Sequence, residues 1–209
     1  TVLAQIPNDP FYDKLWYLEK IHAPEAWEKT TGHDGVTVAV LDSGVDLGHP
    51  DIEGNLWLNE DEVSGNGLDD DGNGYADDMR GWDFVDDVTD AMQGEDNDTP
   101  DNDPSDFVSH GTGVAGVASA VTNNARGIAA LSWNVKIMPL RVGWLRNDFE
   151  GVVSTARDPE AATLSQAAAP LIRGSTRLVA PPHATVSTSD GTSANRARMT
   201  KSRARNPSG

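Results

Sequence analysis

The chain has 209 residues, of which 33 are acidic and 16 basic, giving a net charge of −17, with no cysteine and 37% apolar residues. This length suits one domain of moderate size, or most of one large α/β domain. No apolar run approaches the roughly 18 residues of a membrane-spanning helix, so we expect no membrane segment. The absence of cysteine excludes disulfides and thiolate zinc sites. Phosphates would be repelled by so acidic a protein, so we expect no nucleic-acid partner.

The first third of the chain predicts a short helix and then a buried strand. The opening sequence TVLAQIPNDPFY has neither a basic start nor an apolar signal core and is typical of a mature or clipped end. Pro24 favours a short helix over residues 23–30. The continuous apolar run 36–41 predicts a buried strand of a parallel sheet. Asp42 and Ser43 follow at its carboxyl end, where active sites lie in open α/β sheets.

Residues 59–106 hold most of the negative charge of the chain. They contain 18 acidic residues and a single basic one, Arg80. The segment is rich in Gly, Asn and Asp and has too few apolar residues to form a core. We therefore expect an insertion or loop whose clustered carboxylates require a cation.

The remaining segments predict a helix, a strand and less regular structure. Residues 110–121 are rich in Gly and Ala, which suits a helix packed very close to a sheet. Residues 134–142 predict a second strand, against which Pro139 argues. We expect helix in the Ala-rich segment 150–170, and a strand, a proline turn and a strand over 178–189. The basic segment 194–209 has no apolar stripe and predicts a disordered tail.

Three short motifs carry groups suited to nucleophilic catalysis. They are VLDSGVD around Asp42, SHGTGVAG around His110 and DGTSA around Ser193. A serine nucleophile needs a histidine base, and that base needs a carboxylate to fix its tautomer. Each motif has an ordinary structural interpretation as well: a turn or cap for the aspartate, a satisfied polar group for the histidine, and a common string for the serine.

Together with HPDI (49–52), NNARGIAA (123–130) and KIMPLRV (136–142), these motifs resemble the subtilisin-like serine proteases, or subtilases. The resemblance is strong over 7–142, thin over 143–177, and returns over 178–193. It implies an α/β fold with a doubly wound parallel sheet and helices on both faces. It also implies peptide-bond hydrolysis through an acyl-enzyme, with Ser193 as nucleophile, His110 as base and then acid, and Asp42 orienting His110.

The chain departs from the subtilase pattern at two places. Resembling proteins continue after their GTS with a buried apolar helix, whereas residues 194–201 here include Arg196, Arg198 and Lys201. The interval between His110 and Ser193 is also short, and it lacks the strand that pairs with substrate and the Asn that donates to the oxyanion. We therefore predict a peptidase domain over 1–193 with segments missing within 143–177, and a tail over 194–209. A catalytically impaired, calcium-binding remnant is the alternative.

The acidic segment also carries a calcium-loop pattern. Oxygen-bearing residues at alternate positions followed by glycine reproduce the start of an EF-hand-type loop, although Arg80 stands where the bidentate Glu would be. A solvated acidic loop is the alternative. The resemblance extends to an insertion of some bacterial subtilases, and Asp51 matches a calcium-ligand position in some members. The predicted ligands of a structural calcium ion are Asp69, Asp71, Asn73, Tyr75 through its carbonyl, and Asp77.

The expected partners follow from the implied reaction. They are protein or peptide substrates, and we expect a monomer that is secreted or extracellular. Substrate preference is not readable from the sequence, because the segments that would line the specificity pocket are missing or altered.

Overall fold

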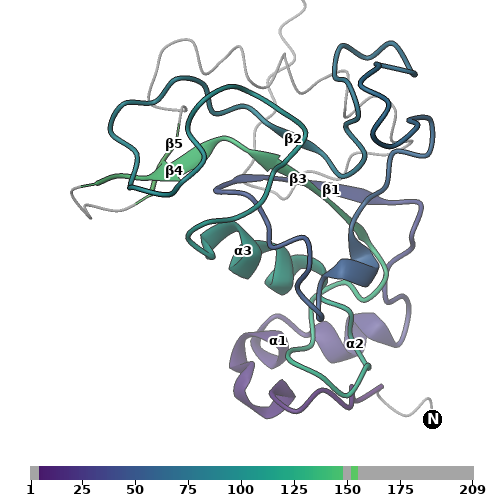
Figure 1. Cartoon of the computed structure of the whole chain (residues 1–209). Coiled ribbons are helices and arrows are strands. Elements are labelled where there is room, and N and C mark those ends of the chain that lie inside the picture. Colours follow the sequence, from purple (N-terminus) through teal and green to yellow (C-terminus); the bar gives the residue numbers. More distant parts are fainter. Residues whose placement is uncertain (1–4, 148–151, 155–209) are drawn as a thin grey trace, which may run out of the picture. The chain divides into compact units, whose positions relative to one another are not determined.

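The computed structural model describes residues 5–147 and 152–154, and its centre is a parallel sheet with the strand order β1-β3-β2 (Figure 1). Strand β1 (Thr37–Asp42) runs beside β3 (Lys136–Arg141) along its whole length. The predicted strands at 36–41 and 134–142 are thereby confirmed. Because the two strands are parallel and in register, Asp42 lies beside Arg141 at the carboxyl edge of the sheet.

Pro139 lies inside the central strand β3 without breaking its pairing to β1. The N–H groups of Lys136 and Val142 donate to the carbonyls of Val36, directly before β1, and of Asp42, its last residue, both at 2.8 Å, so β3 residues with even numbers direct their N–H groups to β1. Pro139 has the opposite parity, and its nitrogen faces the other side of β3. On that side β3 is bridged at Ile137 and paired with β2 from Leu140 onward. Pro139 falls between these two pairings, where the missing N–H removes no ladder hydrogen bond.

Strand β2 (Trp82–Asp83) belongs to the acidic segment 59–106. This segment is expected to be an insertion or loop without core residues; turns and bends do make up most of it, but the expected absence of core residues is wrong beside β2. Phe84 and Val85, directly after β2, are buried, which gives the segment a local share in the core. The average composition of 59–106 conceals this short apolar stretch.

Helix α3 (His110–Ser119) covers one face of the sheet (Figure 1) and confirms the helix predicted at 110–121. Its buried Ala115 packs with Val40 and Ile137, and Gly116 is also buried. Small residues on this face allow the close approach expected from the sequence. On the opposite face, Met138 and Leu140 pack with loop residues such as Phe84, so the expected second helical layer is not among the described residues.

The N-terminal residues form a separate hydrophobic cluster. Its elements are η1 (Tyr12–Lys14), α1 (Trp16–Lys20) and α2 (Ala23–Trp27), the last of which confirms the short helix expected at Pro24. Trp27 is buried and packs edge-on against Trp133, with ring centroids 5.3 Å apart. A further short 3₁₀ helix, η2 (Glu53–Asn55), follows β1 along the chain.

Beyond the sheet, strands β4 (Gly143–Leu145) and β5 (Val152–Ser154) pair antiparallel. The helix expected over 150–170 is therefore wrong at 152–154, where two consecutive valines favour a strand. The rest of that segment, the strands expected over 178–189, Ser193 and the tail 194–209 lie outside the described residues. No helix in the described part of the chain has the length and apolar character needed to cross a bilayer.

Candidate functional site

Asp42 and His110 meet at the carboxyl edge of the sheet. Asp42 is the last residue of β1, and His110 is the first residue of α3. The Nδ1 atom of His110 lies 2.6 Å from Oδ1 of Asp42. Because an ionised carboxylate only accepts hydrogen bonds, Nδ1 carries the proton in this contact, and in the neutral ring Nε2 is free to accept another proton.

The environment of this pair suits a histidine that acts as a base. The Asp42 side chain is 15% exposed, whereas the His110 side chain is 61% exposed. The hydrogen bond that His110 donates to Asp42, together with the negative charge of Asp42, raises the pKa of His110 above 6.5, with a smaller contribution from Asp106. The carboxylate is thus shielded and fixed, while the imidazole is open to a substrate.

The backbone brings α3 very close to the end of β1. Gly111 is buried, and a Cβ atom built on it would lie 2.1 Å from the carbonyl oxygen of Gly44 and 3.0 Å from Cβ of Asp42. The Gly111 N–H donates to Oγ of Ser43 at 3.0 Å. Only a residue without a side chain fits at this position, and the contact sets the distance between the two elements.

The third predicted catalytic residue, Ser193, lies outside the described residues. The structure therefore describes the Asp42–His110 pair alone. The two residues are 68 positions apart in the chain, and each is predicted as a site residue from the motif that contains it.

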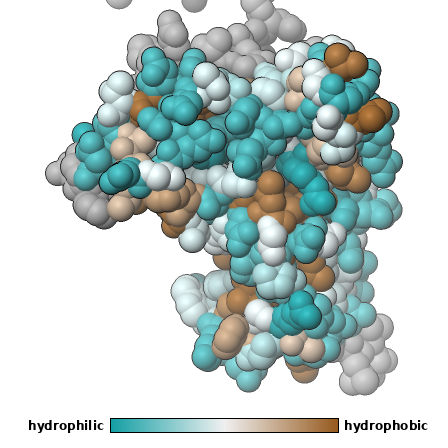
Figure 2. Space-filling view, viewed as in Figure 1, coloured by the Kyte–Doolittle hydropathy of each residue, from teal (hydrophilic) through white to brown (hydrophobic). Residues whose placement is uncertain are grey.

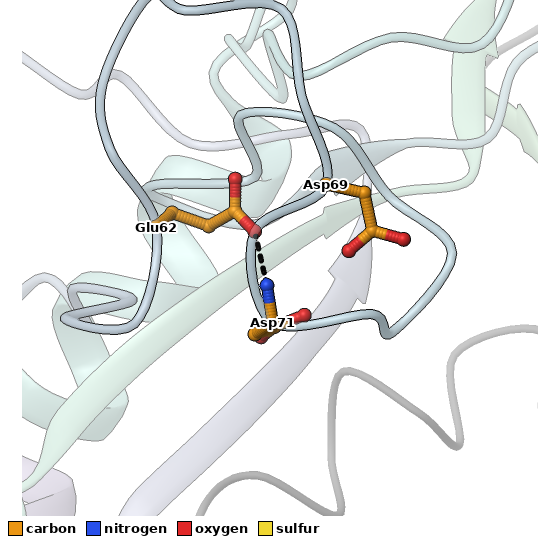
Figure 3. Close-up of side chains that lie close together, drawn as sticks. All are labelled: Glu62, Asp69 and Asp71. Atoms are coloured by element: carbon orange, nitrogen blue, oxygen red, sulfur yellow. Dashed lines mark hydrogen bonds between the residues drawn. The ribbon is translucent and has the colours of Figure 1, made fainter.

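Two of the predicted calcium ligands, Asp69 and Asp71, lie close to a carboxylate outside the predicted set, that of Glu62. Figure 3 shows the carboxylates of Glu62, Asp69 and Asp71 around one space, with the Asp71 N–H donating to Glu62 at 3.2 Å. Each offers one oxygen, and these oxygens lie within 4.8 Å of one another. Glu62 is buried. It precedes the loop pattern, so position-by-position comparison with an EF-hand loop does not find it.

The other predicted ligands have different surroundings. The Asn73 side-chain oxygen accepts the N–H of Tyr75 at 2.8 Å. The Asp77 carboxylate is turned toward a neighbouring bend, where it accepts the N–H groups of Gly65 at 2.6 Å and of Gly67 at 2.7 Å. Asp77 is thus not grouped with Asp69 and Asp71.

Asp51 is buried at a different place. Its Oδ1 atom accepts from the side-chain amide of Asn124 at 2.8 Å, and Oδ2 accepts the N–H of Ile128 at 2.9 Å. Both carboxylate oxygens thus hold the loop that contains the motif NNARGIAA.

A second group of clustered carboxylates surrounds a buried arginine. Asp83, Asp96 and Asp101 lie close together, and the Arg141 guanidinium contacts Asp83 and donates to Glu95 at 3.2 Å. Burial raises the pKa of Asp83 to about 6 in spite of the guanidinium beside it. Here a protein cation already neutralises part of the charge. No lysine or arginine in the described part of the chain forms an ion pair with the first group, Glu62, Asp69 and Asp71.

Negative charge is thus unevenly compensated over the molecule. The face seen in Figure 2 is mostly hydrophilic, with apolar atoms in small separated groups. Near the first carboxylate group, burial and the charges of Asp71 and Glu62 raise the pKa of Asp78, although its hydrogen bonds from Asn59 and Asn73 oppose this. A cation placed there would relieve the repulsion.

Comparison with known proteins identifies the relatives of this chain. A family model described as the subtilase family matches residues 33–167. A thermophilic serine proteinase of Bacillus sp. (strain AK1) is 33% identical over 74% of this chain, and thermitase of Thermoactinomyces vulgaris is 34% identical over 65% of it. The chain spans 30% and 36% of the lengths of these two relatives. A solved protease structure from Pseudoalteromonas arctica PAMC 21717 superposes with a TM-score of 0.52 at 27% identity, covering 84% of this chain and 46% of that one.

Proposed function

Because the chain belongs to the subtilase family, we propose that it is a serine endopeptidase that hydrolyses peptide bonds with Asp42, His110 and Ser193 as its triad. The observation that carries the proposal is the 2.6 Å contact between His110 Nδ1 and Asp42 Oδ1, at the edge of the sheet where α/β enzymes hold their active sites. Its substrates are proteins or peptides, and it acts as a secreted monomer. The relative named as an extracellular protease of Xanthomonas campestris, 30% identical over 65% of this chain, supports the location.

The reaction uses the two nitrogens of His110 in different ways. Nδ1 donates to Asp42, which fixes the ring and stabilises the imidazolium that forms. Nε2 accepts the proton of the Ser193 hydroxyl as its oxygen attacks the scissile carbonyl, and then returns that proton to the leaving amine. Water repeats the sequence on the acyl-enzyme. The exposure of the His110 ring leaves room for a substrate beside it.

A fluorophosphonate probe tests this proposal on the full chain, because it reacts with an activated serine whatever the peptide preference. We expect labelling that is abolished in Ser193→Ala, strongly slowed in His110→Ala, and unchanged in the control Ser189→Ala. Labelling that survives in Ser193→Ala, or is absent from the wild type, contradicts the proposal. Absent labelling together with calcium binding supports the alternative, a non-catalytic calcium-binding remnant.

A structural calcium ion is the second part of the proposal, and the acidic cluster carries it. Three carboxylates supply hard oxygen donors of the kind that calcium prefers, and Glu62 is well placed to supply the carboxylate that Arg80 does not. Asn73 and the Tyr75 carbonyl complete the predicted ligand set. The neighbouring turn that Asp77 binds makes this residue the least suited of the predicted ligands.

Matched variants separate these ligands. Asp71→Asn and Glu62→Gln keep an acceptor oxygen but remove a charge, so we expect both to lose most of the melting-temperature increase that calcium gives the wild type. Asp70→Asn is the control, because its carboxylate binds Val63 and Asn66 and lies outside the cluster. An equal calcium response in Asp71→Asn and Asp70→Asn would exclude this site. A lost response in Asp77→Asn would instead restore Asp77 to the ligand set.

A further inference from the structure

Asp106 joins the end of β1 to the start of α3. Its Oδ1 atom accepts the hydroxyl of Ser43 at 3.0 Å, and its Oδ2 atom accepts both the N–H and the hydroxyl of Thr112, at 2.9 and 2.6 Å. Oδ1 also accepts the N–H groups of Val108 and Ser109, at 3.0 and 2.9 Å. A single carboxylate therefore binds Ser43, which directly follows β1, the loop before α3 and the first turn of α3.

The first turn of α3 depends on these contacts for its hydrogen bonds. The N-cap residue Ser109 has a left-handed backbone with φ 66°, and its side chain makes no capping bond within the described residues. An N-cap side chain normally binds the N–H of the second or third helical residue. Here the second, Gly111, donates to Ser43, and the third, Thr112, donates to Asp106.

The Ser43 hydroxyl links the neighbours of the two site residues. Ser43 follows Asp42 and is fully buried, and Gly111 follows His110. Because the Asp106 carboxylate only accepts, the hydroxyl proton of Ser43 is directed to it, and the Ser43 oxygen is left to accept the Gly111 N–H. The direction of this short chain of hydrogen bonds is therefore set by Asp106.

We propose that Asp106 is a positioning residue for the proposed hydrolysis, which holds the His110 ring against Asp42 through the Ser43 hydroxyl and the first turn of α3. The inference rests on the proposed function, but the geometry that it explains belongs to the described residues alone. A purely stabilising helix cap is the competing explanation. The two differ in what happens to the imidazole once the chain has folded.

The experiment measures the titration of the His110 ring by NMR in the full chain, with the signal assigned by its loss in His110→Gln. The variants are Asp106→Ala and Asp106→Asn, of which the second keeps one acceptor oxygen. Asp103→Ala is the matched control, because the Asp103 carboxylate lies in the same loop but, among the described residues, accepts hydrogen bonds only from Ser105. Fluorophosphonate labelling against pH is followed in parallel.

Both variants remove the negative charge of Asp106 and so lower the titration midpoint of His110. Because Asp106→Ala also removes the acceptor for Ser43 and Thr112, we expect a further fall there, toward the ordinary value of about 6.5. We expect labelling to slow by roughly tenfold to a hundredfold, as for a base displaced by about 1 Å. Asp106→Asn should recover part of both losses, and Asp103→Ala should match the wild type. Equal His110 midpoints and labelling rates in folded Asp106→Ala and Asp106→Asn, even with a lower melting temperature, would reduce Asp106 to a cap and overturn the proposal.

The two proposals fail in different ways. A wild-type chain that never labels contradicts the proposed hydrolysis, while the NMR titration still decides whether Asp106 holds the ring. If Asp106→Ala does not fold, Ser43→Ala decides the question, because it removes the hydroxyl link and leaves the charge of Asp106 in place. A His110 midpoint and labelling rate equal to those of the wild type in Ser43→Ala would then overturn the proposal.

Discussion

Replacing Gly111 by alanine tests how closely α3 must approach β1. The added Cβ would lie 2.1 Å from the Gly44 carbonyl oxygen, whereas Cβ atoms are essentially never found within 3.0 Å of another heavy atom. The helix or the loop must therefore move by about 0.9 Å to remove the clash. Because the obstacle is backbone rather than a flexible side chain, the change cannot be absorbed by a rotamer.

The magnitude follows from that displacement. Overpacking of this kind costs about 1–3 kcal/mol. For a chain of this size, about 2 kcal/mol corresponds to a melting temperature lower by roughly 4–8 °C. A shift of nearly 1 Å at the residue after His110 should also slow fluorophosphonate labelling by about a hundredfold, since catalysis is sensitive to misplacement on this scale.

Gly113 provides the control within the same helix. It is exposed, and beyond its chain neighbours and the backbone of its own helix no described atom lies within 4 Å of a Cβ built on it. Alanine there should raise the stability by up to about 1 kcal/mol through helix propensity and leave labelling unchanged. Melting is followed by circular dichroism. A Gly111→Ala protein that melts at or above the wild-type temperature and labels normally would refute the close approach on which the site geometry depends.

Three further predictions concern charge. Because the pKa of His110 is raised, the labelling rate should rise with pH through a midpoint above 6.5, and this midpoint should be lower in Asp42→Asn. The stability that the Asp42–His110 pair contributes is fully present below pH 6.5 and is lost as pH rises through the folded pKa. His110→Gln should therefore destabilise the chain more at pH 5.5 than at pH 9, and equal effects at both would contradict this. Arg141→Met leaves Asp83 and Glu95 buried without their cation, so we expect the free energy of unfolding in urea to fall by about 3–5 kcal/mol at pH 8. The loss should be smaller at pH 5, because Asp83, with its pKa of about 6, is then protonated. A larger loss at pH 5 than at pH 8 would show the reasoning wrong. A hundredfold excess of calcium over its dissociation constant should stabilise the chain by about 2.7 kcal/mol relative to chelator, with a smaller effect of magnesium, and identical melting in calcium and in chelator would remove the ion.

The sequence predicts those parts of the fold whose signal is local. The run 36–41 is apolar throughout because β1 is buried in a parallel sheet, and the small residues of α3 reflect its close packing. Pro139 argues against a strand only if every residue of a central strand is assumed to donate its N–H to a neighbouring strand. Asp42 and His110 are predicted from their motifs, and the neighbouring Ser43 and Gly111 of those motifs form the hydrogen bond that joins the end of β1 to the start of α3.

The sequence does not reveal contacts between residues far apart in the chain, or contacts of residues that lie outside the fixed spacing of a known motif. Glu62 precedes the calcium-loop pattern and approaches it only through the fold of the loop. Asp106 caps α3 although it lies three residues before the N-cap, whereas the capping rules consider the N-cap residue itself. An acidic residue shortly before a predicted helix could still have been taken as a candidate cap. Strand β2 is hidden because its two residues are surrounded by an acidic composition.

The order in which the site is built follows from where its contacts lie in the chain. Every described group that orients His110 lies between Asp42 and Thr112, and β3, which flanks β1, ends at Arg141. Synthesis proceeds from the amino terminus, so all of these residues leave the ribosome before Ser193 does. In the proposed enzyme the proton acceptor is thus prepared first and the nucleophile is delivered to it last. A nascent chain of the proposed enzyme would be unable to cleave its neighbours until the segment that contains Ser193 has been made.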